Sequence, residues 1–183
     1  MGIYLNQGNI DSNQIEVRRA TAADAKIVAE LGQRTFEETF SDTNTAEDME
    51  KYLRENFSEE QIKSEMENAN SIFFVASIAG KAAAYMKLNT KNAQTEPRGD
   101  NALEIQRLYV LAAFKGKHIG RALMTVAEEE ARWQGLSELW LGVWEHNTAA
   151  KAFYSKLGYS RFGEHTFTLG TDRQTDFLLK KQI

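Results

Sequence analysis

A short stretch of this chain, residues 114–121, gathers two glycines, a histidine and three basic residues with no acid among them. The whole chain carries a formal net charge of −4, so the sign of the charge is reversed locally. An apolar run ends just before the stretch at Val110, and a helix is predicted to begin near Gly120. The first turn of a helix has unpaired N–H groups and a partial positive charge, which suit a phosphate or pyrophosphate. The stretch therefore predicts a site for a phosphorylated ligand; the alternative is an ordinary strand-to-helix turn with solvated lysines.

Two well-known phosphate loops do not fit these residues. A P-loop requires G-x-x-x-x-G-K-[ST], but Gly116 and Gly120 are one residue too close and are followed by Arg121 and Ala122. The dinucleotide pattern G-x-G-x-x-G is absent from the sequence, and so is the G-x-S-x-G elbow of serine hydrolases. The phosphate site predicted here is thus of another kind.

A second segment, residues 140–159, predicts a strand, a capped helix and a turn in direct succession. Residues 140–144 form an apolar run, and Asn147 or Thr148 suits the N-cap of a helix over residues 149–157. Gly158 suits the position that follows the helix. Ala150, Phe153 and Leu157 are spaced by three and four residues, which predicts one apolar face on this helix.

Together the two segments resemble the signatures of the GNAT superfamily of N-acetyltransferases, and the resemblance runs from about Ile15 to the C-terminus. The acetyl-CoA loop of that family, Q/R-x-x-G-x-G/A, reads Lys115-Gly-Lys-His-Ile-Gly120 here, with His118 where glycine is usual. His118 must either avoid a positive φ or accept its cost. The run Asn147-x-x-Ala-x-x-Phe-Tyr-x-x-Leu-Gly-Tyr159 is similar to the second signature. The resemblance implies a single-domain α/β fold with a mixed, mostly antiparallel central sheet flanked by helices, whose central strands splay apart at the acetyl-CoA site.

The resemblance also implies roles for single residues. Asn147 would contact the pantetheine arm of acetyl-CoA, with helix capping as the alternative, and Tyr154 would protonate the departing thiolate, with packing as the alternative. The N–H of Val110 would polarise the thioester oxygen. The cofactor-binding residues implied are Leu108, Tyr109, Val110, Lys115, Gly116, Lys117, His118, Ile119, Gly120, Arg121, Ala122, Asn147, Lys151, Tyr154 and Lys156. No metal is implied.

Transfer of an acetyl group to an amine requires a base. An alkyl ammonium has a pKa near ~10.4 and must lose a proton before it attacks. Glu104 lies six residues before Val110, and the resemblance implies that a glutamate there serves as general base, with its pKa raised by partial burial. The alternative is a structural carboxylate paired with Arg107 or a lysine.

The acceptor is predicted from charge and from a second resemblance. Residues 46–67 contain eight acidic and three basic residues, a net charge of −5, which favours a cationic amine; the alternative is a solvated helical face. Thr35-Phe-x-x-Thr-Phe40 and Glu104-Ile-Gln-Arg-Leu-Tyr-Val110 resemble the PaiA-type bacterial spermidine/spermine N-acetyltransferases. A polyamine such as spermidine or spermine is therefore expected. The alternatives are another GNAT acceptor (a peptide or protein α-amine, an amino acid or an aminoglycoside) and a non-catalytic acyl-CoA-binding regulator.

Composition narrows the class of protein. With 183 residues, 42% of them hydrophobic, the chain suits one domain over residues 15–183, preceded by a polar, flexible arm over residues 1–14. The absence of cysteine excludes disulfides and thiol catalysis and fits the cytoplasm. His118, His146 and His165 are not at metal-ligand spacing and are expected to be solvated or locally bonded. A net acidic chain without a long apolar run predicts neither a nucleic-acid nor a membrane partner, and leaves open whether it forms a homodimer.

The order of elements predicted from these patterns is β-ααα-βββ-α-β-α-ββ. Thr21 and Asp24 resemble a capping box that begins a helix ending near Phe40, and Ala79-Gly80 is the predicted turn of a hairpin. The predicted ranges are strands over 15–19, 71–78, 81–89, 102–110, 139–143, 160–167 and 176–181, helices through 40, 57, 68, 134 and 157, and a turn over 169–173.

Overall fold

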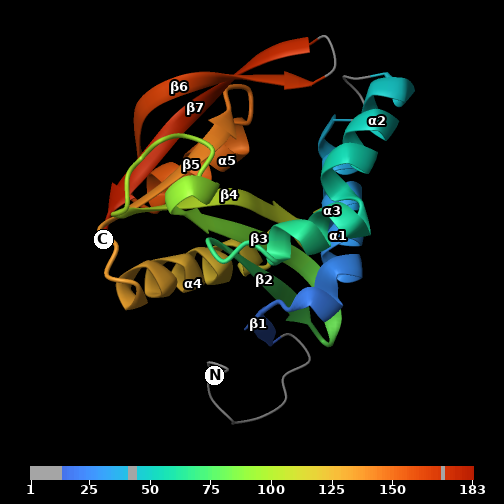
Figure 1. Ribbon diagram of the computed structural model, residues 1–183, viewed down its shortest axis with the longest axis horizontal. Helices are drawn as coiled ribbons and strands as arrows, with labels where there is room; N and C mark the ends of the chain where they lie inside the picture. The colour runs from blue at the N-terminus through green and yellow to red at the C-terminus, as the bar shows by residue number, and fades with distance from the viewer. Residues whose placement is uncertain (1–13, 41–44, 170–171) are drawn as a thin grey trace. The chain divides into compact units, whose positions relative to one another are not determined.

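A computed structural model of the protein describes residues 14–40, 45–169 and 172–183 (Figure 1). Seven strands form one mixed sheet in the order β1-β2-β3-β4-β5-β7-β6. The strands are β1 (Ile15–Arg19), β2 (Ser71–Ile78), β3 (Lys81–Thr90), β4 (Ala102–Val110), β5 (Glu138–Trp144), β6 (Ser160–Leu169) and β7 (Asp172–Gln182). The helices are α1 (Ala25–Phe40), α2 (Ala46–Phe57), α3 (Glu59–Met66), α4 (Ile119–Trp133) and α5 (Thr148–Lys156). The predicted element order and α/β class are confirmed.

The described residues form two compact units, one within residues 14–87 and 107–126 and the other within residues 88–106 and 127–183. In the first unit β1 pairs antiparallel with β2, and β2 and β3 are joined by a tight turn. Ala79 and Gly80 at that turn have φ angles of 50° and 72°, the left-handed pair that a two-residue hairpin demands. The sequence correctly predicted this turn, although alanine rather than glycine bears one of the two positive φ angles.

Helix starts in the first unit are fixed by local capping. The Asp24 carboxylate accepts from the backbone N–H of Thr21 at 2.8 Å and from the Thr21 hydroxyl at 3.1 Å. Two guanidinium nitrogens of Arg18 donate to the same carboxylate, and hydrogen bonding from Arg18 holds the pKa of Asp24 well below its ordinary value. The first turn, Ala22–Asp24, is a 3-10 turn before α1. At α3 the Ser58 hydroxyl accepts from the N–H of Gln61 at 3.2 Å, as predicted, and the helix ends at Met66 rather than near residue 68.

An aromatic cluster joins the helices of the first unit. The ring of Phe36 on α1 stacks on Tyr52 of α2 with centroids 4.5 Å apart, and Phe57 packs 5.6 Å from Phe36. Gly32 makes this packing possible, because a Cβ there would lie 2.5 Å from the Phe57 ring. A larger residue at position 32 would push Phe57 away from α1, and with it the end of α2.

The second unit is built around β5. β4 pairs with β5 in parallel and β7 with β5 antiparallel, while β6 and β7 form an antiparallel hairpin. That hairpin is longer than predicted: Leu169, Asp172 and Arg173 belong to strands, where the sequence indicated a turn, and residues 170–171 lie outside the described residues. The core includes Trp140, Leu103 and Leu139, none of which is exposed.

The parallel pairing of β4 with β5 is short. Their parallel register covers three pairs, from Ala102 with Glu138 to Glu104 with Trp140, whereas β5 continues to Trp144. The splay of the central strands at the acetyl-CoA site stays a prediction. Within the described residues, no helix has both the length and the apolar character needed to cross a membrane.

Candidate functional site

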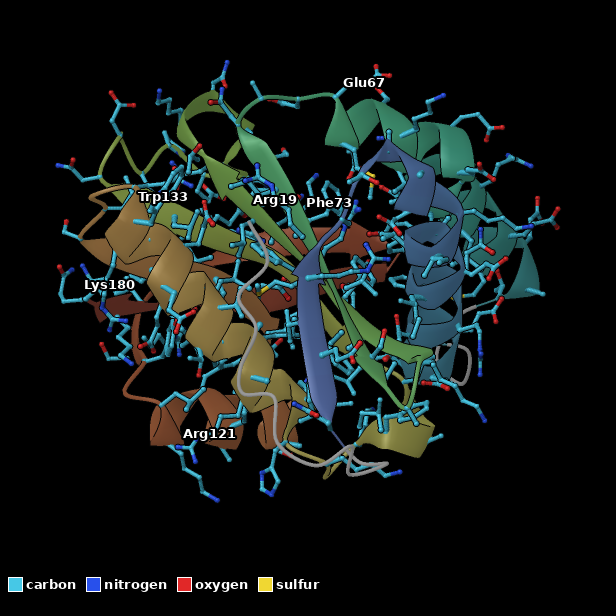
Figure 2. All side chains as sticks on the ribbon, turned by 90° about the horizontal axis from the view of Figure 1, so that it is seen from below. Arg19, Glu67, Phe73, Arg121, Trp133 and Lys180 are labelled. Carbon is cyan, nitrogen blue, oxygen red and sulfur yellow. The ribbon has the colours of Figure 1, made fainter. Side chains whose placement is uncertain are left out.

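The predicted phosphate loop lies in the first unit, ahead of α4. The carbonyl of His118 accepts the first helical hydrogen bond, from the N–H of Ala122 at 3.1 Å. By helix geometry, the preceding amides of Ile119, Gly120 and Arg121 have no acceptor within α4. Lys115, Lys117 and Arg121 are exposed around them, and Arg121 is labelled in Figure 2. Three amides and three cations of this kind suit an anionic group such as a diphosphate, and the binding of acetyl-CoA by this loop stays a prediction.

The loop backbone explains why the family pattern places glycine where this chain has His118. Gly116 and His118 have φ angles of 78° and 63°, both in the left-handed region. Histidine is tolerated there more often than most residues, but it still pays a conformational cost. The structure therefore realises the second of the two alternatives for His118: the loop keeps its positive φ and accepts the strain.

We expect His118→Gly to stabilise the protein by up to about 1 kcal/mol, because it removes a side chain from a left-handed position. Thermal unfolding of the free protein measures the effect. Lys117→Gly is the matched control, since φ at Lys117 is not positive and that change only adds freedom to the unfolded chain. Lys117→Gly should lower stability. If His118→Gly lowers it by the same amount, His118 is not strained.

The second predicted segment lies in the second unit. The Asn147 Oδ1 accepts from the N–H of Ala150 at 3.0 Å, so the capping role is confirmed, and the side-chain amide Nδ2 is the group that can donate to a ligand. Contact of Asn147 with pantetheine stays a prediction. Gly158 ends α5 with a φ of 88°, as its position predicted.

Tyr154 is the most enclosed side chain of α5. It is 8% exposed, and its ring meets those of Phe153 and Tyr159 edge to face, with centroids 5.2 and 5.8 Å away. This packing gives the ring a fixed orientation, which a proton donor requires. The role of Tyr154 as general acid stays a prediction. Of the two lysines predicted to bind cofactor from α5, Lys156 is exposed, whereas Lys151 donates to the carbonyl of Glu145 within the same unit.

Glu104 is buried and accepts three hydrogen bonds. It is 2% exposed; Asn89 Nδ2 and the Thr95 N–H donate to one carboxylate oxygen at 3.1 and 2.9 Å, and the Thr95 hydroxyl donates to the other. These contacts favour the structural alternative for Glu104, as an anchor of residues 91–100, while its role as general base stays a prediction. The predicted partner was wrong: Arg107 does not pair with Glu104, because residues an odd number apart on a strand point to opposite faces.

Arg107 belongs to a buried ionic cluster of the first unit that sequence reasoning did not find. Its guanidinium donates to both oxygens of Glu65 on α3 at 2.8 and 3.1 Å, and Lys87 Nζ donates to the same carboxylate at 2.8 Å. Burial would raise the pKa of Glu65, but the charges of Arg107 and Lys87 outweigh it and hold that pKa below the ordinary value. One carboxylate between two cations ties α3 to β3 and β4. The alternation along β4 was the available signal, since it excludes Glu104 as a partner.

Comparisons with known proteins agree with this geometry. The acetyltransferase (GNAT) family matches residues 32–159. An uncharacterised N-acetyltransferase of Lactobacillus delbrueckii subsp. lactis is 40% identical over 169 residues, covering 92% of this chain and 98% of the relative. A spermidine N(1)-acetyltransferase of Thermoplasma acidophilum is 26% identical over 149 residues, covering 79% and 88%. The crystal structure of the PaiA N-acetyltransferase of Thermoplasma acidophilum in complex with coenzyme A has the same fold, with a TM-score of 0.76 and 24% identity over 93% of this chain and 99% of that one.

Proposed function

The chain belongs to the GNAT family and is an acetyl-CoA-dependent N-acetyltransferase, and from this premise we propose that its acceptor is a primary amine of a polyamine such as spermidine or spermine. The observation that carries the proposal is the acidic surface of α2 and α3. Six carboxylates of the two helices and the residue after them are exposed: Glu47, Glu50, Glu55, Glu59, Glu60 and Glu67. The spermidine acetyltransferase among the relatives supports the same acceptor.

The negative charge that α2 and α3 can offer to a polyamine is smaller than the net charge counted from the sequence. The net charge of −5 over residues 46–67 counts Glu65, whose carboxylate is already bound by Arg107 and Lys87. The side chain of Asp48 lies outside the described residues. The exposed acids remain in excess over the exposed cations of the same segment, Lys51, Arg54 and Lys63. A flexible polycation with spaced charges needs dispersed acids rather than a rigid pocket, which is what these helices offer.

The chemistry assigned to the chain is direct transfer. Acetyl-CoA would be held by the amides and cations of residues 115–121, and the N–H of Val110 would donate to the thioester oxygen as its charge develops. The neutral amine nitrogen attacks the thioester carbon, forming the C–N bond while the C–S bond breaks. Tyr154 would give its proton to the departing thiolate, and the proton that the attacking nitrogen loses as it becomes an amide would restore the Tyr154 hydroxyl.

Acetylation of spermidine is expected to depend on salt and on the acids of α3. Glu59→Gln with Glu60→Gln should raise KM for spermidine several-fold and leave kcat nearly unchanged, because surface charges that only attract the substrate act on binding. The rate of free thiol release at two ionic strengths measures this, and KM in the wild type should rise with added salt.

The matched control is Glu129→Gln with Glu130→Gln on α4, which removes the same charge from another helix. An equal rise of KM in the control would mean that net charge alone, and not the surface of α2 and α3, attracts the substrate. Turnover of a peptide or uncharged amine, without turnover of spermidine or spermine, would contradict the polyamine proposal and indicate another acceptor of the family.

A further inference from the structure

Three titratable side chains from three segments of the second unit meet on the face of the sheet that residues 91–100 cover. Nδ1 of His165 on β6 lies 2.9 Å from Oε1 of Glu96 in that loop. Nε2 of the same ring lies 3.7 Å from Oδ2 of Asp176 on β7. His165 and Asp176 are partners across the β6–β7 ladder. The imidazole thus stands between two carboxylates, hydrogen-bonded to one and just beyond hydrogen-bond distance of the other.

These groups border an open position on β5. Gly142 is exposed, and a Cβ added to it would lie 3.5 Å from Asp176 Oδ2 and 3.9 Å from His165 Cε1. Its neighbour on the same face, Trp144, pairs with Asp176. Gly142 lies beyond Trp140, where the register with β4 has ended, and β5 leads directly to the helix of Tyr154. A small substrate group can therefore approach the backbone of β5 there, with the Asp176 carboxylate at its side.

We propose that Asp176 accepts the proton of the acceptor ammonium above Gly142, and that His165, oriented by Glu96, carries that proton onwards. The proposal rests on the N-acetyltransferase activity and not on the identity of the amine. It assigns to Asp176 the role of general base and to Glu96 that of a positioning residue.

The proton of the ammonium passes through two side chains to solvent. The N–H bond of the ammonium breaks and its proton bonds to the Asp176 carboxylate, which becomes neutral and leaves a neutral amine free to attack the thioester. Asp176 then passes the proton to Nε2 of His165, which becomes an imidazolium between two carboxylates, Glu96 on Nδ1 and Asp176 on Nε2. The half-exposed imidazolium returns the proton to solvent, so each group is restored for the next turnover.

Electrostatics suit Asp176 for this task better than Glu104. Burial raises the pKa of Asp176, an effect that His165 only partly offsets, and a raised pKa brings a carboxylate nearer to the range useful for a base. Glu104 already accepts three hydrogen bonds, which leaves it fewer lone pairs for a substrate proton. The other charged groups along this face, Arg98 of the loop and Lys180 of β7, are both bound to Glu138.

The test is the pH dependence of kcat/KM for the amine at saturating acetyl-CoA, between about pH 6 and pH 10, with the acceptor that a panel of amines identifies. In the wild type kcat/KM should level off well below the amine pKa of about 10.4. Asp176→Asn should lower kcat/KM about 10²-fold near pH 7, and the remaining activity should keep rising up to the amine pKa, because only amine already neutral in solution can react. His165→Gln should give the same trend with a smaller loss.

Glu164→Gln is the matched control, since Glu164 carries the same charge beside His165 but is exposed and paired with Arg161. Unchanged acetyl-CoA affinity by calorimetry confirms that each variant is folded, and His165→Gln decides alone if Asp176→Asn does not fold. A pH profile of kcat/KM equal to that of the wild type in Asp176→Asn would overturn the proposal. If Asp176→Asn does not fold, the same result in His165→Gln would overturn it. So would a lost plateau in a parallel Glu104→Gln variant with Asp176→Asn unaltered. If spermidine is inert and another amine reacts with the expected profiles, the polyamine acceptor fails and this proposal stands.

Discussion

Tyr154→Phe should lower kcat by about 10²-fold while acetyl-CoA affinity stays within a few-fold of wild type. The change removes one hydroxyl and keeps the ring, whose packing against Phe153 and Tyr159 orients it. Without that proton donor the thiolate must leave as an anion or take a proton from water, and the transition state loses its stabilisation. Steady-state thiol release at saturating substrates gives kcat, and calorimetry gives the affinity for acetyl-CoA.

Tyr159→Phe is the control for this experiment. The Tyr159 hydroxyl is buried and has no hydrogen-bond partner within the described part of the chain, and burial raises its pKa. Removing an unpartnered buried hydroxyl should leave stability unchanged or slightly higher and should not change kcat. If Tyr154→Phe also keeps kcat within a few-fold of wild type, Tyr154 is a packing residue and another group protonates the thiolate.

Glu65→Gln should destabilise the protein by about 3 kcal/mol or more, because it leaves two enclosed cations without their counter-ion. The side chains of Arg107, Lys87 and Glu65 are only 10%, 8% and 13% exposed, so water can replace little of what the carboxylate supplies. Denaturant unfolding of the free protein measures the loss. Glu60→Gln on the same helix is the control: its side chain is exposed, and the change should stay within about 0.5 kcal/mol.

The same cluster predicts how stability depends on pH. The pKa of Glu65 is lower in the folded protein than in the unfolded chain, so its contribution is fully present above the unfolded value. It is lost as pH falls through the lowered folded pKa, below the ~4.3 of an unperturbed glutamate. The difference in stability between wild type and Glu65→Gln should therefore shrink in acid. A difference that is small at neutral pH would show that water reaches the two cations.

Interactions between near neighbours in sequence were predictable, because their geometry is set within one or two turns of chain. Thr21 with Asp24, Ser58 with Gln61, and Asn147 with Ala150 are three residues apart, and each forms the cap that the pattern predicted. The hairpin turn at Ala79-Gly80 and the left-handed Gly158 belong to the same class. The two signatures that carry the acetyltransferase assignment are also local, since each is a strand end, a loop and a helix start.

The ionic partners were decided by the tertiary structure alone. Glu65 lies 22 and 42 residues from Lys87 and Arg107, and Glu96 lies 69 residues from His165. Which groups meet over such separations depends on the order of strands and on their register. A shift of one residue would turn every side chain of a strand to the other face.

The ends of β6 and β7 were missed for the same reason: their polar tips lack an apolar pattern, and the cross-strand ladder alone extends them. Sequence determined the family, the helix caps and the predicted phosphate loop of this protein. Tertiary structure decided which carboxylates are engaged by cations and which lie beside a histidine, because desolvation and charge pairing act between groups that only the folded sheet brings together.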